Sequence, residues 1–289
     1  MIVFAYACLR REFRALASQQ PDSGEIPTPD AVHRTRIAAR RLRVALKTFK
    51  HLLPARAAAL RAELRWFARA LGDVRDLDVY TSNLHHYAEA VSGDPGEFAE
   101  YAQHVHAARD AARAQLPALF ADPRYLALLE SLAVFLEDSP SSRALRRWRS
   151  FSVRKGARAY LQKSIKRIVK RGDKIVAGST ARDLHRLRIM AKHLRYELEF
   201  FAAAFPPLHG QANVVKRLQD VLGEYQDACT ASARVRGYIR ERGRAPGALR
   251  ALLHDHEQLG AAAERRFELE WRSFKKNLSV DELRERLAA

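Results

Sequence analysis

Two segments of the chain, 152 residues apart, have clearly related sequences. "HRTRIAARRLRVALKTF" (33–49) aligns without gaps to "HRLRIMAKHLRYELEFF" (185–201), and nine of the seventeen positions are identical. A second pair, "LGDVRDLDV" (71–79) and "LGEYQDACT" (222–230), follows at almost the same offset, 151 residues. Because two matches in register are typical of a repeated structural unit, the sequence predicts two equivalent halves, about 1–138 and 143–289. "DSPSS" (138–142) is the candidate linker.

The remaining sequence shows the three- and four-residue apolar spacing of amphipathic helices, with little strand-like alternation. Glycine is scarce, at 13 of 289 residues. The fold class is therefore predicted to be all-α, with each half a small helical bundle. Between helix breakers, the spacing predicts helices over about 3–18, 31–52, 55–71, 74–91, 97–116, 123–137, 145–171, 181–204, 209–223, 225–242, 247–274 and 280–287.

The charge of the chain is far from balanced. It has 51 Lys and Arg against 33 Asp and Glu, a net charge of +18, and a pI near 10.4. Such a surplus repels itself in a folded protein unless it serves solubility, steering or an anionic partner. The partner classes are nucleic acid, an anionic membrane or a small acidic polymer.

Several classes of protein are disfavoured. Cys8 and Cys229 form no CxxC pair, so neither a disulfide framework nor a zinc site is expected. No window is apolar enough for a membrane span, and the N-terminus is predicted to be a helix and not a signal peptide. The histidine pairs lack the i,i+4 spacing of metal ligands. We expect a cytoplasmic protein with no metal, cofactor or membrane partner.

The repeated segment places its basic residues along one side of a helix. On a helical wheel, His33 and four cations form a stripe about 80° wide, opposite the apolar face; the cations are Arg36, Arg40, Arg43 and Lys47. In the second copy the same stripe contains His185, Arg188, Lys192 and Arg195, and Glu199 replaces Lys47. We call these the first and the second stripe.

A basic helix face is usually just solvated, but three features favour an anion site here. The stripes are nearly all of one sign, whereas solvated faces mix signs. They are rich in Arg, whose rigid fork suits phosphate oxygens. They also recur at matching positions. We expect the two histidines to donate to phosphate, more effectively once protonated.

Other basic residues are candidates for the same surface, although each taken singly can equally be a solvated residue. Arg61, Arg65 and Arg69 stand at i, i+4 and i+8 on the segment that leads to Gly72. Among the basic residues outside the two stripes, we select as candidate polyphosphate-binding residues Arg69, Arg75, Lys216, Arg11, Arg14, Lys163 and Lys166.

Catalytic machinery is not evident in the sequence. Asp76, Asp78 and Asp227 are interpreted as groups that orient arginines or cap helices. No paired carboxylates, nucleophile–base arrangement or Gly-rich phosphate loop stands out.

These motifs resemble the CHAD family, the conserved-histidine α-helical domain. The resemblance rests on "VHRTRIAARRLRVALKTF", "LGDVRDLDV", "LHRLRIMAKHLRYELEFF" and "LQDVLGEYQDA", in that order, and spans essentially the whole chain. It implies one CHAD domain over 1–289, in which two bundles related by a pseudo-twofold axis turn their basic helices toward a central cleft or pore. It also implies binding of inorganic polyphosphate and association with polyphosphate granules.

The sequence departs from the family in two ways. Many CHAD proteins carry an N-terminal CYTH domain with an ExExK motif, but here only "ELEWR" (268–272) is similar, so a standalone CHAD protein without the hydrolase is expected. In the second copy His193 replaces Arg41 and Glu199 replaces Lys47, so the halves need not bind equally.

Three functions are weighed. A non-enzymatic polyphosphate-binding protein is favoured, because Tyr196 is the only aromatic residue near a stripe and single-strand binders depend on base stacking. A nucleic-acid binder is the alternative. An enzyme acting on polyphosphate or nucleotides is the weakest hypothesis.

Overall fold

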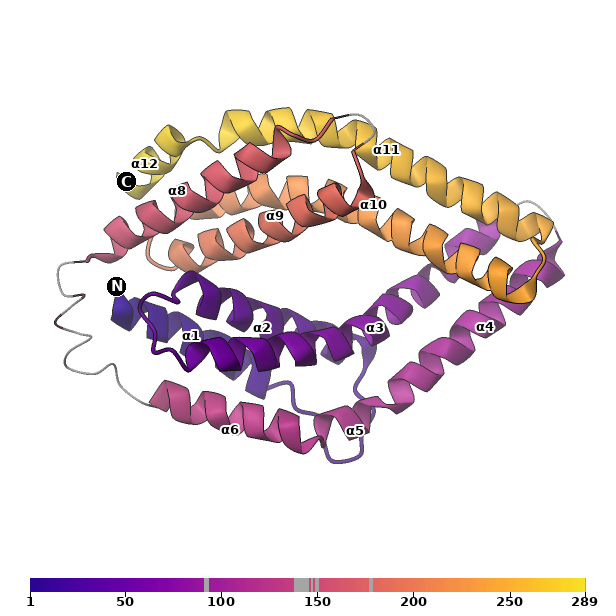
Figure 1. Cartoon of the computed structure of the whole chain (residues 1–289), viewed down its shortest axis with the longest axis horizontal. Coiled ribbons are helices and arrows are strands. Elements are labelled where there is room, and N and C mark those ends of the chain that lie inside the picture. Colours follow the sequence, from indigo (N-terminus) through magenta and orange to yellow (C-terminus); the bar gives the residue numbers. More distant parts are fainter. Residues whose placement is uncertain (91–93, 138–145, 147, 149–150, 177–178, 289) are drawn as a thin grey trace. The chain divides into compact units, whose positions relative to one another are not determined.

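The computed structural model describes residues 1–90, 94–137, 146, 148, 151–176 and 179–288. All regular elements in this part of the chain are helices, as predicted (Figure 1). The predicted linker, 138–142, lies outside it. The helices are α1 (Ile2–Ala17), α2 (Pro29–Thr48), α3 (Ala57–Ala90), α4 (Pro95–Ala114), α5 (Leu116–Phe120), α6 (Pro123–Glu137), α8 (Val153–Gly172), α9 (Ala181–Ala202), α10 (Leu208–Arg242), α11 (Gly247–Asn277) and α12 (Val280–Ala288).

Two predicted helix breaks are wrong. Gly72 and Gly223 do not end helices but lie buried inside α3 and α10, each of which continues through two predicted segments. Glycine weakens a helix interior without breaking it, and tertiary packing overrides the local penalty. In both places an arginine side chain from another helix packs against the glycine, which keeps the position inside the packed structure.

The chain divides into two compact units, and each is made of two separate segments. The first comprises Met1–Leu84 and Ala102–Val153, whereas the second comprises His85–Tyr101 and Arg154–Ala289. The predicted halves differ from these units mainly in residues 85–101. These residues belong to the second unit because they pack there: the Tyr87 ring lies 4.7 Å from the His256 ring, and Tyr101 lies 5.1 Å from Tyr238.

The core of the first unit is built from aromatic contacts between distant helices. Phe67 of α3 stacks on Tyr125 of α6, with ring centroids 4.1 Å apart, and Phe120 contacts both rings edge-on. Tyr6 of α1 stacks on Phe135 of α6 at 6.0 Å. Large rings of this kind contribute most of the apolar area that a small core buries.

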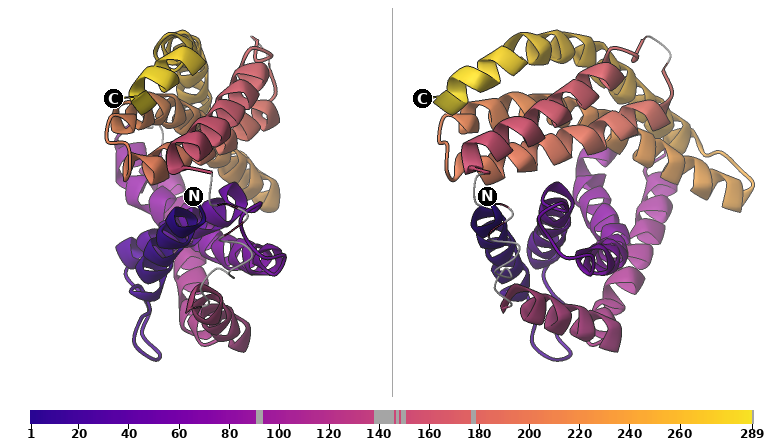
Figure 2. Two further views of the ribbon diagram at one scale, coloured as in Figure 1. Left: turned by 90° about the vertical axis from the view of Figure 1, so that its left-hand side faces the viewer. Right: turned by 60° about the vertical axis from the view of Figure 1, so that its left-hand side comes forward.

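In the second unit, α10 lies alongside both α9 and α11 (Figures 1 and 2). The Trp271 side chain of α11 covers the C-terminal end of α8 at Gly172, where an added Cβ would lie 2.2 Å from the indole ring. Only glycine allows this approach. The indole Nε1 donates to Asp173 at 3.1 Å, which satisfies its polar group.

The two stripe helices begin in the same way. Thr28 caps α2 by accepting a hydrogen bond from the Ala31 amide, and Thr180 caps α9 by accepting one from the Asp183 amide. Each cap precedes the stripe histidine by five residues, so the caps set both stripes in the same register. None of the helices in the described ranges is both long and apolar enough to cross a membrane.

Candidate anion-binding site

The first stripe lies along α2 with its side chains partly covered. His33, Arg36, Arg40 and Arg43 are half-buried, and Lys47 is exposed at the C-terminal end. The opposite face of α2 is buried in the first unit, for example at Leu42. The wheel therefore assigned both faces of this helix correctly.

One arginine in each stripe packs against a glycine of the neighbouring long helix. The Arg36 guanidinium lies 3.6 Å from the position that a Cβ would take at Gly72, and Arg188 lies at the same distance from Gly223. On each long helix, the aspartate four residues after the glycine forms an ion pair with the same arginine. Arg36 lies 3.6 Å from Asp76, and Arg188 lies 3.9 Å from Asp227. Both guanidiniums are thereby oriented before any ligand binds.

Arg43 stands at the centre of a cluster of cations formed by α2 and α3. Burial lowers its pKa, and the positive charges of neighbouring arginines lower it further. Such a cluster favours a bound anion, because an anion relieves the repulsion among its members. The neighbours are Arg40, Arg65, Arg69 and Arg61. Arg61 and Arg65 were not selected from the sequence, although their i, i+4, i+8 spacing with Arg69 indicated them.

The environment of His33 opposes its protonation. Partial burial lowers the pKa of His33, as do the positive charges of Arg75, Arg36 and Arg40, while Asp30 raises it. In the unliganded protein His33 is therefore neutral at pH 7, and protonation has to follow the arrival of an anion. The Arg75 Nε is buried and has no hydrogen-bond acceptor among the described residues, so it also favours an added oxygen ligand.

The second stripe has more neutral and acidic neighbours. The His185 imidazole hydrogen-bonds to the Gln226 amide oxygen at 2.8 Å. The Arg195 Nε lies 3.5 Å from a carboxylate oxygen of Glu199. On α10, Lys216 donates to Asp220 at 2.6 Å, so this candidate already has an anionic partner.

Four further candidates lie on α1 and α8, and among the described residues no hydrogen bond or ion pair links them to a stripe. Arg11 donates to the buried carboxylate of Glu12, which also accepts from Arg41 at 2.7 Å. Arg41 lies about 120° around α2 from the centre of the first stripe, so Arg11 is directed toward another face. The other three are exposed; they are Arg14, Lys163 and Lys166.

The acidic residues have arginine partners, as interpreted from the sequence. Besides Asp76 and Asp227, the buried Asp78 accepts from Arg109 at 2.9 Å and from Arg113 at 3.0 Å. Within the described ranges, no group of three or more His, Cys, Asp or Glu side chains is arranged to hold a metal ion.

The aromatic residues near the stripes differ from expectation. Tyr196 is only 2% exposed, and the Arg195 guanidinium lies 5.0 Å from its ring, so it offers no free face. Sequence reasoning missed Trp66, which lines a pocket of about 560 Å³ in the first unit together with Arg65 and Arg69. The Arg124 guanidinium, held by Glu63 at 2.6 Å, lies 4.2 Å from the Trp66 ring.

Comparison with known proteins concerns the family and the fold of the chain. The family model described as CHAD domain matches residues 7–236. The fold is similar to that of the CHAD domain from the plant Ricinus communis, with a TM-score of 0.69, 21% identity, and coverage of 100% of this chain and 92% of that one. It is also similar to PptA from Streptomyces chartreusis, with a TM-score of 0.73, 18% identity, and coverage of 94% and 99%. No curated protein matched.

Proposed function

Because the chain belongs to the CHAD domain family, some of whose members bind polyphosphate, we propose that it binds inorganic polyphosphate along its two basic stripes. The observation that carries the proposal is the cation cluster around Arg43, where burial and then the charges of neighbouring guanidiniums on α2 and α3 lower the pKa of Arg43. A chain of phosphates provides the regularly spaced negative charge that such a cluster lacks.

The surroundings of the stripes favour a ligand without bases. Proteins that bind single-stranded nucleic acid gain about 1–3 kcal/mol from each base stacked on an aromatic side chain. Tyr196 is buried and one face of Trp66 lies against Arg124. Polyphosphate needs no stacking, and its affinity comes from guanidinium and ammonium contacts and from the release of counterions.

The test is a calorimetric titration with long-chain polyphosphate at near-physiological salt, repeated with single-stranded and duplex DNA. We expect polyphosphate to bind at least tenfold more tightly per phosphate than either DNA. The charge reversals Arg36→Glu and Arg188→Glu should weaken polyphosphate binding while circular dichroism shows a folded protein. Arg265→Glu, an exposed position on α11, is the matched control for the change in net charge. Equal losses in all three variants would mean that only net charge matters.

Nucleic-acid binding is the second candidate, and the pocket that contains Trp66 favours it. A base could stack on Trp66 if the Arg124 side chain moved away, while Arg65 and Arg69 contacted phosphates. Trp66→Ala separates the two functions. We expect it to leave polyphosphate affinity unchanged, whereas a loss of affinity for single-stranded DNA alone would identify the aromatic pocket as a nucleic-acid site.

The proposal extends to the role of the protein in the cell. A protein that binds long polyphosphate chains without cleaving them would associate with polyphosphate granules. A fluorescent fusion should then localise to granules in cells, and the Arg36→Glu variant should not. The proposal excludes catalysis, since the carboxylates next to the stripes are paired with arginines. Release of orthophosphate by the purified protein in the presence of Mg²⁺ would contradict this part.

A further inference from the structure

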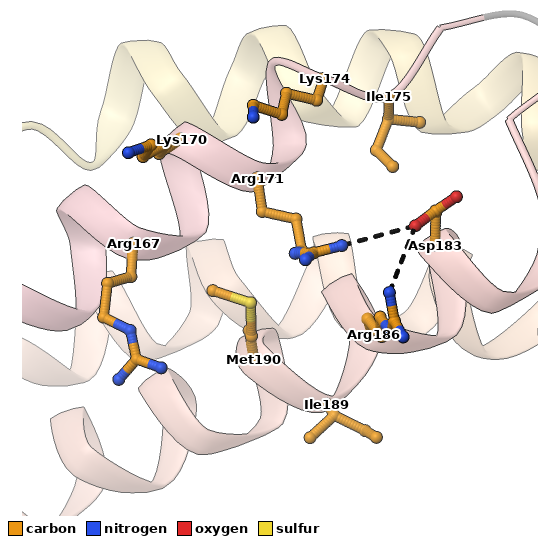
Figure 3. A pocket seen from close by; sticks show the side chains of 9 residues that line it. All are labelled: Arg167, Lys170, Arg171, Lys174, Ile175, Asp183, Arg186, Ile189 and Met190. Atoms are coloured by element: carbon orange, nitrogen blue, oxygen red, sulfur yellow. Dashed lines mark hydrogen bonds and ion pairs between the residues drawn. The ribbon is translucent and has the colours of Figure 1, made fainter.

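A second basic site lies between α8 and α9 in the second unit. The two helices and the loop after α8 enclose an open pocket of about 660 Å³ (Figure 3). Five of the residues that line it are cationic, and one is acidic; they are Arg167, Lys170, Arg171, Lys174, Arg186 and Asp183. None of these residues is a stripe residue.

The pocket faces away from the second stripe. On the α9 wheel, Arg186 and Met190 lie about 100° and 140° from His185, whereas the stripe cations lie between about 280° and 340°. Both residues face α8 instead, where they line the pocket. A ligand in the pocket is therefore held by different side chains from a polyanion on the stripe.

One carboxylate organises the two arginines at one end of the pocket. Asp183 lies 3.4 Å from Arg171 and 3.9 Å from Arg186 (Figure 3). It also accepts a hydrogen bond from the Thr180 hydroxyl at 2.7 Å. The carboxylate thus holds two guanidiniums near each other. It compensates only part of the charge, because no acidic partner among the described residues pairs with the other three cations; these are Arg167, Lys170 and Lys174.

The corresponding helices of the first unit, α1 and α2, have no matching group of cations at the equivalent positions. At the positions 152 residues earlier, the four basic residues from α8 and its following loop are replaced, and only Arg186 has a basic equivalent, Arg34. Arg34 pairs with Gln19 and Asp30. The cations are thus not a by-product of the repeated sequence. The replacing residues are Ala15, Ser18, Gln19 and Asp22.

The pocket also has an apolar floor, which distinguishes it from the stripes. Met190 lies between Arg167 at one end and Asp183 at the other in Figure 3, and Ile175 and Ile189 line the same space. Ile189 is 42% exposed, so its side chain is available to a ligand. A bare phosphate chain gains nothing from this surface, whereas a ligand with a flat, partly apolar group buries it.

We propose that this pocket binds a nucleoside triphosphate, with its phosphates at Arg167 and Lys170 and its base over Met190 and Ile189. The Asp183 carboxylate repels phosphate, which directs the phosphates to the opposite end of the pocket. It can instead accept hydrogen bonds from the ribose hydroxyls or from an amino group of the base. The volume is within the range of small-molecule sites. The inference does not depend on polyphosphate binding.

The test is a calorimetric titration of the intact chain with ATP and with tripolyphosphate, which has the same number of phosphates and no base. We expect ATP to bind at least tenfold more tightly. Arg167→Gln/Lys170→Gln should weaken ATP binding at least tenfold. These exposed side chains have no ion-pair partner in the described structure, so the fold should be preserved, and thermal melting checks it.

Two control variants locate the site. Arg34→Gln removes the equivalent of Arg186 in the first unit, and Arg36→Gln alters the first stripe; both should leave ATP affinity within twofold. Tripolyphosphate binding as tightly as ATP would overturn the assignment of a nucleotide. ATP binding that survives Arg167→Gln/Lys170→Gln but is lost in Arg36→Gln would overturn the pocket itself.

Discussion

The two stripes share a framework and differ in charge. In both, a threonine cap sets the register, a histidine opens the stripe, and an arginine packs on a glycine of the neighbouring helix, 3.6 Å from the position that a Cβ would take there. Around this framework, nine positions of the first stripe and of the adjoining part of α3 can be compared with their equivalents in the second unit, and in the first unit they hold eight cations and one carboxylate. They are Arg36, Arg40, Arg43, Lys47, Arg61, Arg65, Arg69 and Arg75, with Asp76.

The equivalent positions of the second stripe and α10 contain four cations and three carboxylates. They are Arg188, Lys192, Arg195 and Lys216, with Glu199, Asp220 and Asp227. The remaining two positions are Ala212 and Gln226. The framework orients side chains equally in both units, whereas the charge favours polyanion binding by the first unit. The orientation of the stripe side chains and their affinity for polyphosphate should therefore vary independently, and the following variants test this.

The largest effect is expected from matched double charge reversals. Arg40→Glu/Arg43→Glu should lower polyphosphate affinity about 100-fold, because each charge-assisted hydrogen bond contributes about 1.5–3 kcal/mol. Lys192→Glu/Arg195→Glu should lower it only about tenfold, since Glu199 already opposes binding there. Titrations at two salt concentrations measure both. Equal losses would show that the two stripes contribute equally despite their charges.

A smaller effect should follow from exchanging the residues that end the stripes. Glu199→Gln removes the carboxylate beside Arg195 and should raise polyphosphate affinity about two- to fivefold, which corresponds to the weak coupling of partly exposed ion pairs. Lys47→Gln in the first unit should lower it by a similar factor. Calorimetry measures the polyphosphate affinity of both variants. If affinity rose in both or fell in both, the residues that end the stripes would not account for the difference between the two units.

The pH dependence should come partly from His33. In the free protein the pKa of His33 is lowered. An anion bound beside the imidazole raises this pKa again, so the protein takes up a proton when polyphosphate binds. Polyphosphate affinity should therefore rise a few-fold as the pH falls from 8 to 5.5, and His33→Gln should reduce this rise. For the unliganded protein the sign is opposite: the unfolded chain binds the proton more readily, so stability decreases as the pH falls below 6.5. Affinity that is independent of pH in the wild type would contradict this role.

The smallest effect is expected at the glycines. Gly72→Ala and Gly223→Ala should each raise the free energy of unfolding by about 0.5–1 kcal/mol, because alanine favours a helix interior and the new Cβ reaches the guanidinium only at ordinary contact distance. Urea unfolding measures the gain. Polyphosphate affinity should not change; a loss in either variant would mean that the glycine keeps space open for a phosphate beside the arginine.

The sequence was sufficient for the elements of the fold and for the stripes. The period that places Arg36, Arg40 and Arg43 on one face is a local property of a helix, so it can be counted from residue numbers. The prediction failed near Gly72 and Gly223, where it divided each of the long helices α3 and α10 into two. The reason lies outside the segment, because the arginine that packs on each glycine comes from another helix.

The neighbours of the site also needed the structure. The Lys216–Asp220 pair has i,i+4 spacing and could have been identified from the sequence. The contacts of Trp66 with Arg124, and of Asp183 with Arg171, connect residues on separate helices. The position of 85–101 in the second unit depends on Tyr87 and Tyr101 meeting partners more than 130 residues away.

The sequence by itself determined the all-α class, the register of the two stripes and the excess of positive charge. Only the tertiary structure decided which of these charges lie close together. Helix formation and periodicity depend on near neighbours in the chain, whereas electrostatic interaction depends on distance in space and on burial. For this reason two related segments form a cluster of mutually repelling arginines in one unit and a surface with several carboxylates in the other.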